Sequence, residues 1–174
     1  NEVIPYDQAL YLAGNKGIIR FPEKKWVIEN TRVFKLSRYN EGILFLSDQG
    51  LYRYQDGEAS LWVEGLFSDF ISDTASSTVI LKADNNLYLL DAGDPSSLKA
   101  SKLIRDFNYL EYLVTGSKLY YITPRGFKII NLRQGQSEEI LFPEYIRPLR
   151  IMNTLAVGNR ILLFTSKDVW IFDV

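Results

Sequence analysis

Short apolar runs alternate with short polar turns along the chain, and one combination of the two occurs five times. Each copy has an apolar run, a tight polar turn and a second apolar run. The copies are LYLAGNKGIIRF from Leu10, ILFLSDQGLYRYQ from Ile43, VILKADNNLYLLDA from Val79, KLYYITPRGFKIINL from Lys118 and RILLFTSKDVWIFDV from Arg160. Their second runs begin at Ile18, Leu51, Leu87, Phe127 and Val169, at intervals of 33, 36, 40 and 42 residues. This pattern predicts five β-hairpins.

The turns contain residues that accept the positive φ angles of tight hairpins. They are Asn15 to Gly17, Asp48 to Gly50, Asp84 to Asn86, Pro124 to Gly126 and Ser166 to Asp168. A further apolar run precedes each hairpin, and another follows each of the first four. The predicted unit is therefore a four-stranded antiparallel meander. A helix over Pro95 to Ile104, capped by Ser96 or Ser97, is the only competing local structure.

A four-stranded meander repeated about every 40 residues is typical of a β-propeller, whose blades bury their faces against one another. We therefore expect one all-β domain, or a fragment of a larger propeller, over residues 1–174. The expected blades are residues 1–30, 31–65, 66–105, 106–143 and 144–174. A β-sandwich or barrel is the alternative, but neither needs the same hairpin to recur.

The fifth predicted blade contains three strands and reaches Val174. Two hypotheses account for its outermost strand. Either Glu2 to Ile4 completes the blade, or the natural chain continues past Val174. We favour continuation, because an apolar strand such as WIFDV leaves an exposed sheet edge that aggregates.

Charge and composition exclude several classes of function. Lys and Arg total 20 and Asp and Glu total 21, whereas a protein that neutralises phosphates usually has a positive excess. We therefore expect no nucleic-acid binding. The chain has no Cys and no His, which removes thiol and imidazole catalysis and the usual zinc and haem ligands. We expect no cofactor and no metal, and no apolar run is long enough to span a membrane.

The remaining candidates for chemistry are carboxylates and tryptophans. The carboxylate pairs Asp69 and Asp73, Asp91 and Asp94, and Glu138 and Glu139 lie at predicted strand ends or turns, where solvated or turn-bonding roles are the simpler reading. Asp84-Asn85-Asn86 lacks the spaced acidic pattern of a calcium loop and fits a type I′ turn better. Trp26 and Trp62 begin similar outer strands, so packing between blades is favoured over a sugar-binding platform.

A binding site on this fold would lie on one rim, where the hairpin turns and the links between blades meet. Unlike side chains on repeated loops favour recognition by loop variation. The turn residues on this rim are Lys16, Gln49, Asn85, Arg125 and Lys167, and the link residues are Arg32, Arg105, Tyr145 and Arg147. Because this set is mainly basic and amide-bearing, we expect an anionic or polyhydroxyl ligand.

The stretch GILFLSDQGLYRYQDGE resembles the repeats of two-component-regulator propellers, the extracytoplasmic sensor regions of hybrid histidine kinases and one-component regulators. Gly50-Leu51-Tyr52 and Tyr54 match that repeat, and Asn86-Leu87-Tyr88 repeats the match with Asn in place of Gly. Phe45 and Leu81 stand where the family usually has Trp. Quinoprotein-like repeats and citron-homology propellers have similar hairpins.

This resemblance implies a non-catalytic sensor domain of a two-component-type signalling protein. Such a domain would bind a small polar or carbohydrate ligand and relay binding through rearrangement of a homodimer. It would be periplasmic or extracellular. The alternative is a protein-interaction scaffold in trafficking or envelope assembly, with a protein partner and a cytoplasmic location allowed. An enzyme is the least favoured hypothesis.

Overall fold

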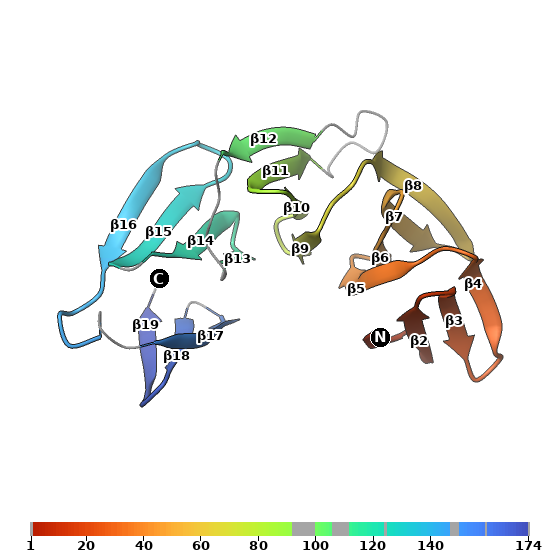
Figure 1. Cartoon of the computed structure of the whole chain (residues 1–174), viewed down its shortest axis with the longest axis horizontal. Helices are drawn as coiled ribbons and strands as arrows, with labels where there is room; N and C mark the ends of the chain where they lie inside the picture. The colour runs from red at the N-terminus through yellow and green to blue at the C-terminus, as the bar shows by residue number, and fades with distance from the viewer. Residues whose placement is uncertain are drawn as a thin grey trace. The chain divides into compact units, whose positions relative to one another are not determined.

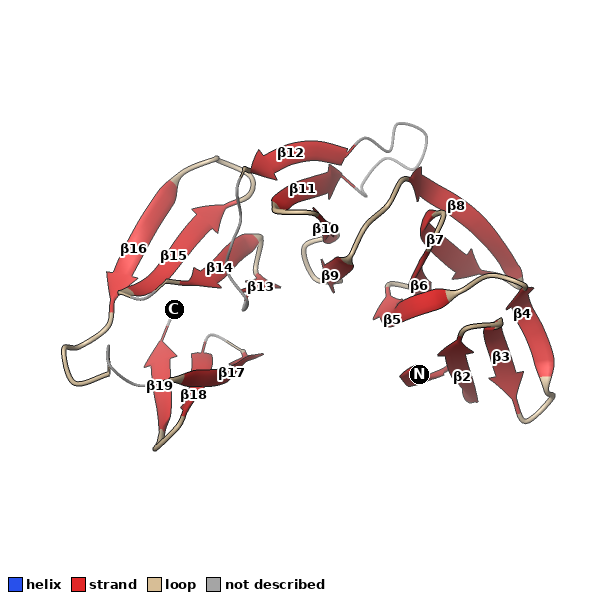
Figure 2. Ribbon diagram, viewed as in Figure 1, coloured by secondary structure: helices blue, strands red, loops and turns tan. Residues whose placement is uncertain are grey.

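The protein is described from a computed structural model that covers residues 2–91, 100–105, 112–123, 125–146, 150–158 and 160–173. Throughout these ranges the regular elements are β-strands, nineteen in number, and Figure 2 shows them joined by turns and loops. The expected all-β class is confirmed. The strands form two compact units, Asn1–Phe107 and Asn108–Val174.

The first unit holds three four-stranded antiparallel meanders, labelled in Figure 1. The first sheet contains β1 (Glu2–Tyr6), β2 (Ala9–Gly14), β3 (Gly17–Phe21) and β4 (Lys25–Glu29). The second contains β5 (Val33–Tyr39), β6 (Gly42–Ser47), β7 (Gly50–Gln55) and β8 (Glu58–Glu64). The third contains β9 (Asp69–Asp73), β10 (Thr78–Ala83), β11 (Asn86–Asp91) and β12 (Ala100–Ile104).

The second unit holds two further meanders. The fourth sheet contains β13 (Tyr112–Thr115), β14 (Lys118–Ile122), β15 (Gly126–Asn131) and β16 (Ser137–Leu141). The fifth sheet has three described strands, β17 (Ile151–Val157), β18 (Arg160–Thr165) and β19 (Val169–Asp173). All five predicted hairpins are therefore confirmed, and each sheet lies within the residue range expected for its blade.

Two local alternatives are also decided. The segment that could have formed a helix provides β12 from Ala100 to Ile104, and residues 92–99 lie outside the described ranges. Glu2 to Ile4 cannot complete the fifth sheet, because β1 pairs with β2 as the first strand of its own meander.

Each sheet has two apolar faces because apolar side chains alternate to both sides of its central strands. In the second sheet we call one side the B face, with Ile43, Phe45, Tyr52 and Tyr54, and the other the A face, with Leu44, Leu46, Leu51 and Arg53. The same names apply to the equivalent positions of the other sheets. Figure 1 shows the second sheet between the first and the third within the first unit.

The sheets of the first unit pack with the A face of one against the B face of the next. One buried cluster joins Tyr11, Ala13 and Ile18 of the first sheet to Ile43 and Phe45 of the second. The next cluster joins Leu44, Leu46 and Leu51 to Phe70, Val79 and Leu81 of the third sheet. Lys35 and Asp69 add an ion pair of 2.6 Å between strands β5 and β9.

The second unit repeats this packing. Tyr120, Phe127 and Ile129 on the A face of the fourth sheet meet Ile161 and Leu163 on the B face of the fifth. The Phe127 ring lies edge-on to the Phe172 ring, with their centroids 5.1 Å apart. Large aromatic side chains therefore fill the space between twisted sheets in this unit, as they do in the first.

The outer strands correct the predicted equivalence of Trp26 and Trp62. Register irregularities lie between Ile18 and Ile19 and between Leu51 and Tyr52, and they pair Ile19 with Trp26 but Tyr52 with Leu61. Trp26 therefore corresponds to Leu61, and Trp62 corresponds to Val27. Trp26 is 39% exposed, whereas Trp62 packs against the buried cluster that joins the second sheet to the third. Packing between blades is confirmed for Trp62, whereas Trp26 lies on a side of the first sheet that no other described sheet of this unit covers.

Truncation of these two tryptophans tests whether they occupy different positions in their sheets. We expect Trp62→Ala to lower the free energy of unfolding by about 3 kcal/mol, because it removes a ring packed between two sheets. Trp26→Ala should cost less, about 1 kcal/mol, since this residue is 39% exposed and lies outside the cluster between the first two sheets. Urea titrations followed by circular dichroism measure both values, and equal losses would contradict the assigned register.

Burial between the first two sheets raises the pKa of Tyr11 to about 12, and the neighbouring Tyr54 also contributes to the increase. An unfolded tyrosine ionises near pH 10. Below pH 10 the stabilisation from neutral Tyr11 is fully present, and it is lost as the pH rises from about 10 through about 12. At pH 11 this residue should account for a loss of about 1.4 kcal/mol relative to pH 8.

The variant Tyr11→Phe isolates that contribution. Its free energy of unfolding should fall less than that of the unchanged protein between pH 8 and pH 11, because phenylalanine does not ionise. Urea titrations at several pH values show how the free energy of unfolding of each protein changes with pH. Parallel declines would show that Tyr11 ionises at its ordinary pKa in the folded protein.

Candidate functional site

The rim of each sheet is the end that carries the turn of its central hairpin. Antiparallel pairing places the start of the first strand, this turn and the end of the fourth strand together. The structure places eight of the predicted residues at the rims of their own sheets, whereas Arg147 lies outside the described residues. Lys16, Arg32, Gln49, Asn85 and Arg105 belong to the first unit, and Arg125, Tyr145 and Lys167 belong to the second.

The backbone of the rim is fixed by a repeated hydrogen bond. The carbonyls of Lys16, Gln49 and Arg125 accept hydrogen bonds of 2.7 to 3.1 Å from the first N–H after the fourth strand. The donors are Asn30, Gly65 and Phe142. Each bond joins the hairpin turn to the link that leaves the sheet. The carbonyl thus has a structural role, and the side chain at the same position remains available for recognition.

A hydroxyl at the end of the second strand also holds three of the turns. Ser47 accepts a hydrogen bond from the Gln49 N–H at 3.0 Å. Thr123 accepts from Arg125 and Gly126, and Thr165 accepts from Lys167 and Asp168. The signal for this motif, Ser or Thr three residues before Gly or Asp, was present in the sequence but not used.

These turns differ from the prediction in backbone conformation. Among the described rim turn residues, positive φ is found at Gly17, Gly50 and Asp84. It recurs instead at the other end of the sheets, at Asp7 and Gln8, at Asp56 and Gly57, and at Gly116 and Ser117. At the rim, Gly50 is needed for a second reason: a Cβ there would lie 2.1 Å from the carbonyl oxygen of Val63.

A shallow pocket of about 310 Å³ surrounds Gln49 at the rim of the second sheet. Its lining residues are Asp48, Gln49, Leu61, Glu64, Gly65 and Leu66. The Tyr52 hydroxyl donates a 2.6 Å hydrogen bond to the side-chain oxygen of Gln49, which leaves the Gln49 amide NH₂ to face a ligand. Leu61 and Leu66 are exposed, so the pocket combines apolar surface with two carboxylates and an amide.

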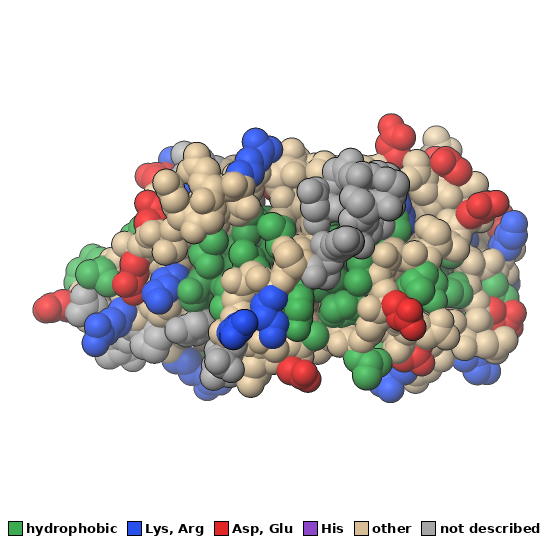
Figure 3. Space-filling model, turned by 90° about the horizontal axis from the view of Figure 1, so that it is seen from above, with side chains coloured by type: hydrophobic (Ala, Val, Ile, Leu, Met, Phe, Trp, Pro, Cys, Tyr) green, Lys and Arg blue, Asp and Glu red, His purple; other side chains and the backbone are tan. Residues whose placement is uncertain are grey.

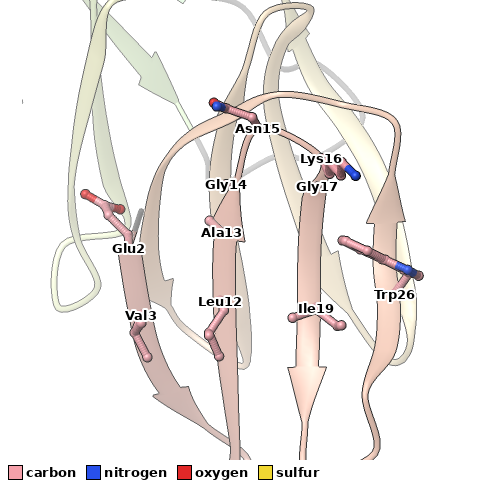
Figure 4. Close-up of a pocket in the computed structure, with 10 residues that line it drawn as sticks. All are labelled: Glu2, Val3, Leu12, Ala13, Gly14, Asn15, Lys16, Gly17, Ile19 and Trp26. Carbon is pink, nitrogen blue, oxygen red and sulfur yellow. The ribbon is translucent and has the colours of Figure 1, made fainter.

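A second hollow, of about 290 Å³, includes Lys16 and extends over the B face of the first sheet. Figure 4 shows Val3, Leu12 and Ile19 on adjacent strands, with Trp26 on the fourth strand and Lys16 at the turn. The lining is mainly apolar, with Glu2, Asn15 and Lys16 as its polar residues. Lys16 and Gln49 therefore belong to two different pockets and do not form one site.

Two other rim residues contact aromatic rings. The Arg32 guanidinium lies 4.9 Å from the centroid of the Phe34 ring, and the Tyr145 ring lies 5.2 Å from the Trp170 ring. Figure 3 shows one surface of the molecule, on which acidic and basic side chains are interspersed with apolar ones. The predominance of basic groups expected for the rim does not hold around Gln49, where both ionisable lining residues are acidic.

Three of the carboxylates considered for catalysis have local partners. Asp69 pairs with Lys35, and Asp73 accepts a 2.6 Å hydrogen bond from Ser76. Glu138 lies 3.7 Å from Lys118, and Asp94 is outside the described ranges. Where side chains are described, no three Asp or Glu residues gather closely enough to hold a metal ion. In the same part of the chain, no helix has the length and apolar character to cross a membrane.

No protein-family model matches the sequence, and no curated protein matches it. Solved structures do match. The extracellular domain of the candidate one-component system BT4673 from B. thetaiotaomicron aligns with a TM-score of 0.64 and 17% identity over 97% of this chain and 26% of that chain. The extracellular domain of the candidate hybrid two-component system BT3049 from the same organism gives 0.63 and 14% over 98% and 28%.

The CNH domain of AfRom2 aligns with a TM-score of 0.72 and 13% identity over 98% of this chain and 67% of that domain. This chain spans about a quarter of the length of the two B. thetaiotaomicron domains. The likeness to two-component-regulator propellers that the Gly50-Leu51-Tyr52 hairpin led us to expect is confirmed at the level of structure. Five recurring meanders and these structural neighbours identify the fold of the chain as a β-propeller.

Proposed function

We propose that this chain is a non-catalytic sensor propeller of a two-component-type signalling protein and lies outside the cytoplasm. The likeness to the extracellular domains of BT4673 and BT3049 supports this proposal. The rim supports it as well, because a fixed backbone there carries different side chains at equivalent positions: Lys16, Gln49 and Arg125. Variation on a fixed scaffold suits recognition of a ligand.

The pocket around Gln49 is the proposed ligand site, and it favours a neutral polyhydroxyl ligand. Hydroxyl groups of a sugar can donate to the carboxylates of Asp48 and Glu64 and accept from the Gln49 amide. Leu61 and Leu66 provide apolar surface for the C–H face of the ring. The volume of about 310 Å³ is at the lower end of the range for small-molecule sites. An anionic ligand is disfavoured here, because two carboxylates would repel it.

Calorimetric titration with a panel of neutral and anionic monosaccharides and disaccharides tests this site. A neutral sugar should bind, and Glu64→Gln should weaken its binding by about 10- to 100-fold through loss of a charge-assisted hydrogen bond. Gln49→Ala should also weaken binding. Gln55→Ala is the matched control, because Gln55 lies at the opposite end of β7 and should leave the affinity unchanged.

Two results would contradict the proposal. If no neutral sugar binds the unchanged chain at millimolar concentration, the ligand class is wrong. If a sugar binds equally to the unchanged protein, Glu64→Gln and Gln49→Ala, the site lies elsewhere.

The second candidate function is a protein-interaction scaffold. Leu66 is 80% exposed at the rim and adjoins exposed Leu61, a pattern that also suits contact with an apolar protein surface. The structural likeness to the CNH domain of AfRom2 is compatible with this function. Recovery of one stable protein partner that Leu66→Asp abolishes, together with no sugar binding, would favour the scaffold.

A further inference from the structure

The side chain of Gln49 is held by a hydroxyl group from its own sheet. The Tyr52 hydroxyl lies 2.6 Å from the side-chain oxygen of Gln49. This separation is typical of an O–H···O bond and is shorter than the usual N–H···O range. The amide oxygen therefore bonds to Tyr52, and the NH₂ group of the same amide is left for another partner.

The charges of the pocket favour the same orientation of the amide. Asp48 and Glu64 line the pocket together with Gln49. An amide oxygen turned toward these two carboxylates would bring a third acceptor beside groups of like charge. The NH₂ group instead supplies a side-chain donor, which the other lining residues lack. The hydrogen bond and the electrostatics therefore both present Gln49 to the pocket as a donor.

Tyr52 is itself held by the packing of the second sheet. Its ring pairs across the strands with Phe45, and the two rings stack with their centroids 5.0 Å apart and their planes at 10°. Phe45 is completely buried in the cluster between the first and second sheets. Because a tyrosine side chain has two rotatable angles, a stacked ring also fixes the place of its hydroxyl. The flexible Gln49 side chain is thus bound to a rigid point.

The equivalent positions of the other hairpins do not form this pair. The residues that stand three positions after the other rim turn residues are Ile19, Tyr88, Lys128 and Trp170. Of these, Tyr88 alone has a hydroxyl, and its turn residue Asn85 is one methylene shorter than Gln49. Lys102 lies over the Tyr88 ring, 5.6 Å from its centroid. Among the described hairpins, the bond is therefore specific to the second sheet and is not a consequence of the repeat.

We propose that Tyr52 is the positioning residue of the Gln49 site and sets its specificity by holding the Gln49 amide as a hydrogen-bond donor. A ligand must then offer an acceptor, such as a hydroxyl or ring oxygen of a sugar, to the NH₂ group. Without the Tyr52 hydroxyl the amide would rotate, and binding would have to order it again. The inference rests on the proposed sugar site, but the orientation of the amide is measurable without a ligand.

Nuclear magnetic resonance relaxation of the ligand-free chain tests the positioning directly. The Gln49 NH₂ group should have an order parameter above about 0.6 in the unchanged protein and below about 0.6 in Tyr52→Phe. Phenylalanine keeps the ring that stacks on Phe45, so the fold should be preserved. Tyr88→Phe is the matched control, because it removes the hydroxyl at the equivalent position of the third sheet and should leave Gln49 unchanged.

Calorimetric titration with D-glucose, D-galactose, D-mannose and N-acetyl-D-glucosamine tests the consequence for binding. A sugar that binds the unchanged chain should bind Tyr52→Phe about 3- to 10-fold more weakly and Tyr88→Phe equally well. In the Gln49→Ala background, Tyr52→Phe should have no additional effect, because Tyr52 acts through Gln49. Gln49→Glu keeps an acceptor for Tyr52 but loses the donor, so it should weaken binding at least as much as Gln49→Ala.

Three results would overturn the proposal. The first is a Gln49 amide that is mobile in the unchanged protein, or equally rigid in folded Tyr52→Phe. The second is a sugar that binds the unchanged chain and Tyr52→Phe with the same affinity. The third is a loss of affinity from Tyr52→Phe that is equally large in the Gln49→Ala background, which would indicate a general effect on the fold. If none of the four sugars binds, the proposed function fails, and the order parameters alone then decide whether Tyr52 positions Gln49.

Discussion

Burial of apolar sheet faces against one another is the interaction on which the rest of this structure depends. All six residues of β6 are buried, since Leu44 and Leu46 face the third sheet while Ile43 and Phe45 face the first. A four-stranded sheet with two apolar faces cannot be covered by its own residues. Each meander therefore requires neighbours, and the repeat in the sequence follows from that requirement.

The rim is held in place without its exposed side chains. Hairpin turns are held by backbone groups and by hydroxyls such as Ser47, so the turn geometry does not depend on the exposed side chains. Lys16, Gln49 and Arg125 can then differ without cost to the fold. This arrangement allows chemistry to change locally: the Gln49 pocket is acidic, whereas the hollow beside Lys16 is mainly apolar.

Sequence pattern predicted the strands well because each hairpin is encoded locally by two apolar runs and a turn. It failed for Trp26 and Trp62, which look equivalent because each begins a similar outer strand but which are not equivalent by strand pairing. One extra residue in each outer strand changes which side chain points inward, and such irregularities have no clear sequence signal. Positive φ angles occur in three of the predicted turns, at Gly17, Gly50 and Asp84, and a hydroxyl such as that of Ser47 also holds the turn backbone.

The sequence alone determined the repeat, the all-β class, the order of strands in each meander and the end of each sheet at which Lys16, Gln49 and the other rim residues lie. These features depend on contacts between residues close together in the chain. Only the tertiary structure decided which faces are covered, which rim residues share a pocket, and that Asp48 and Glu64 make the surroundings of Gln49 acidic. Those properties arise where separate strands meet. The spacing of residues in the sequence does not reveal how far apart their side chains lie in space.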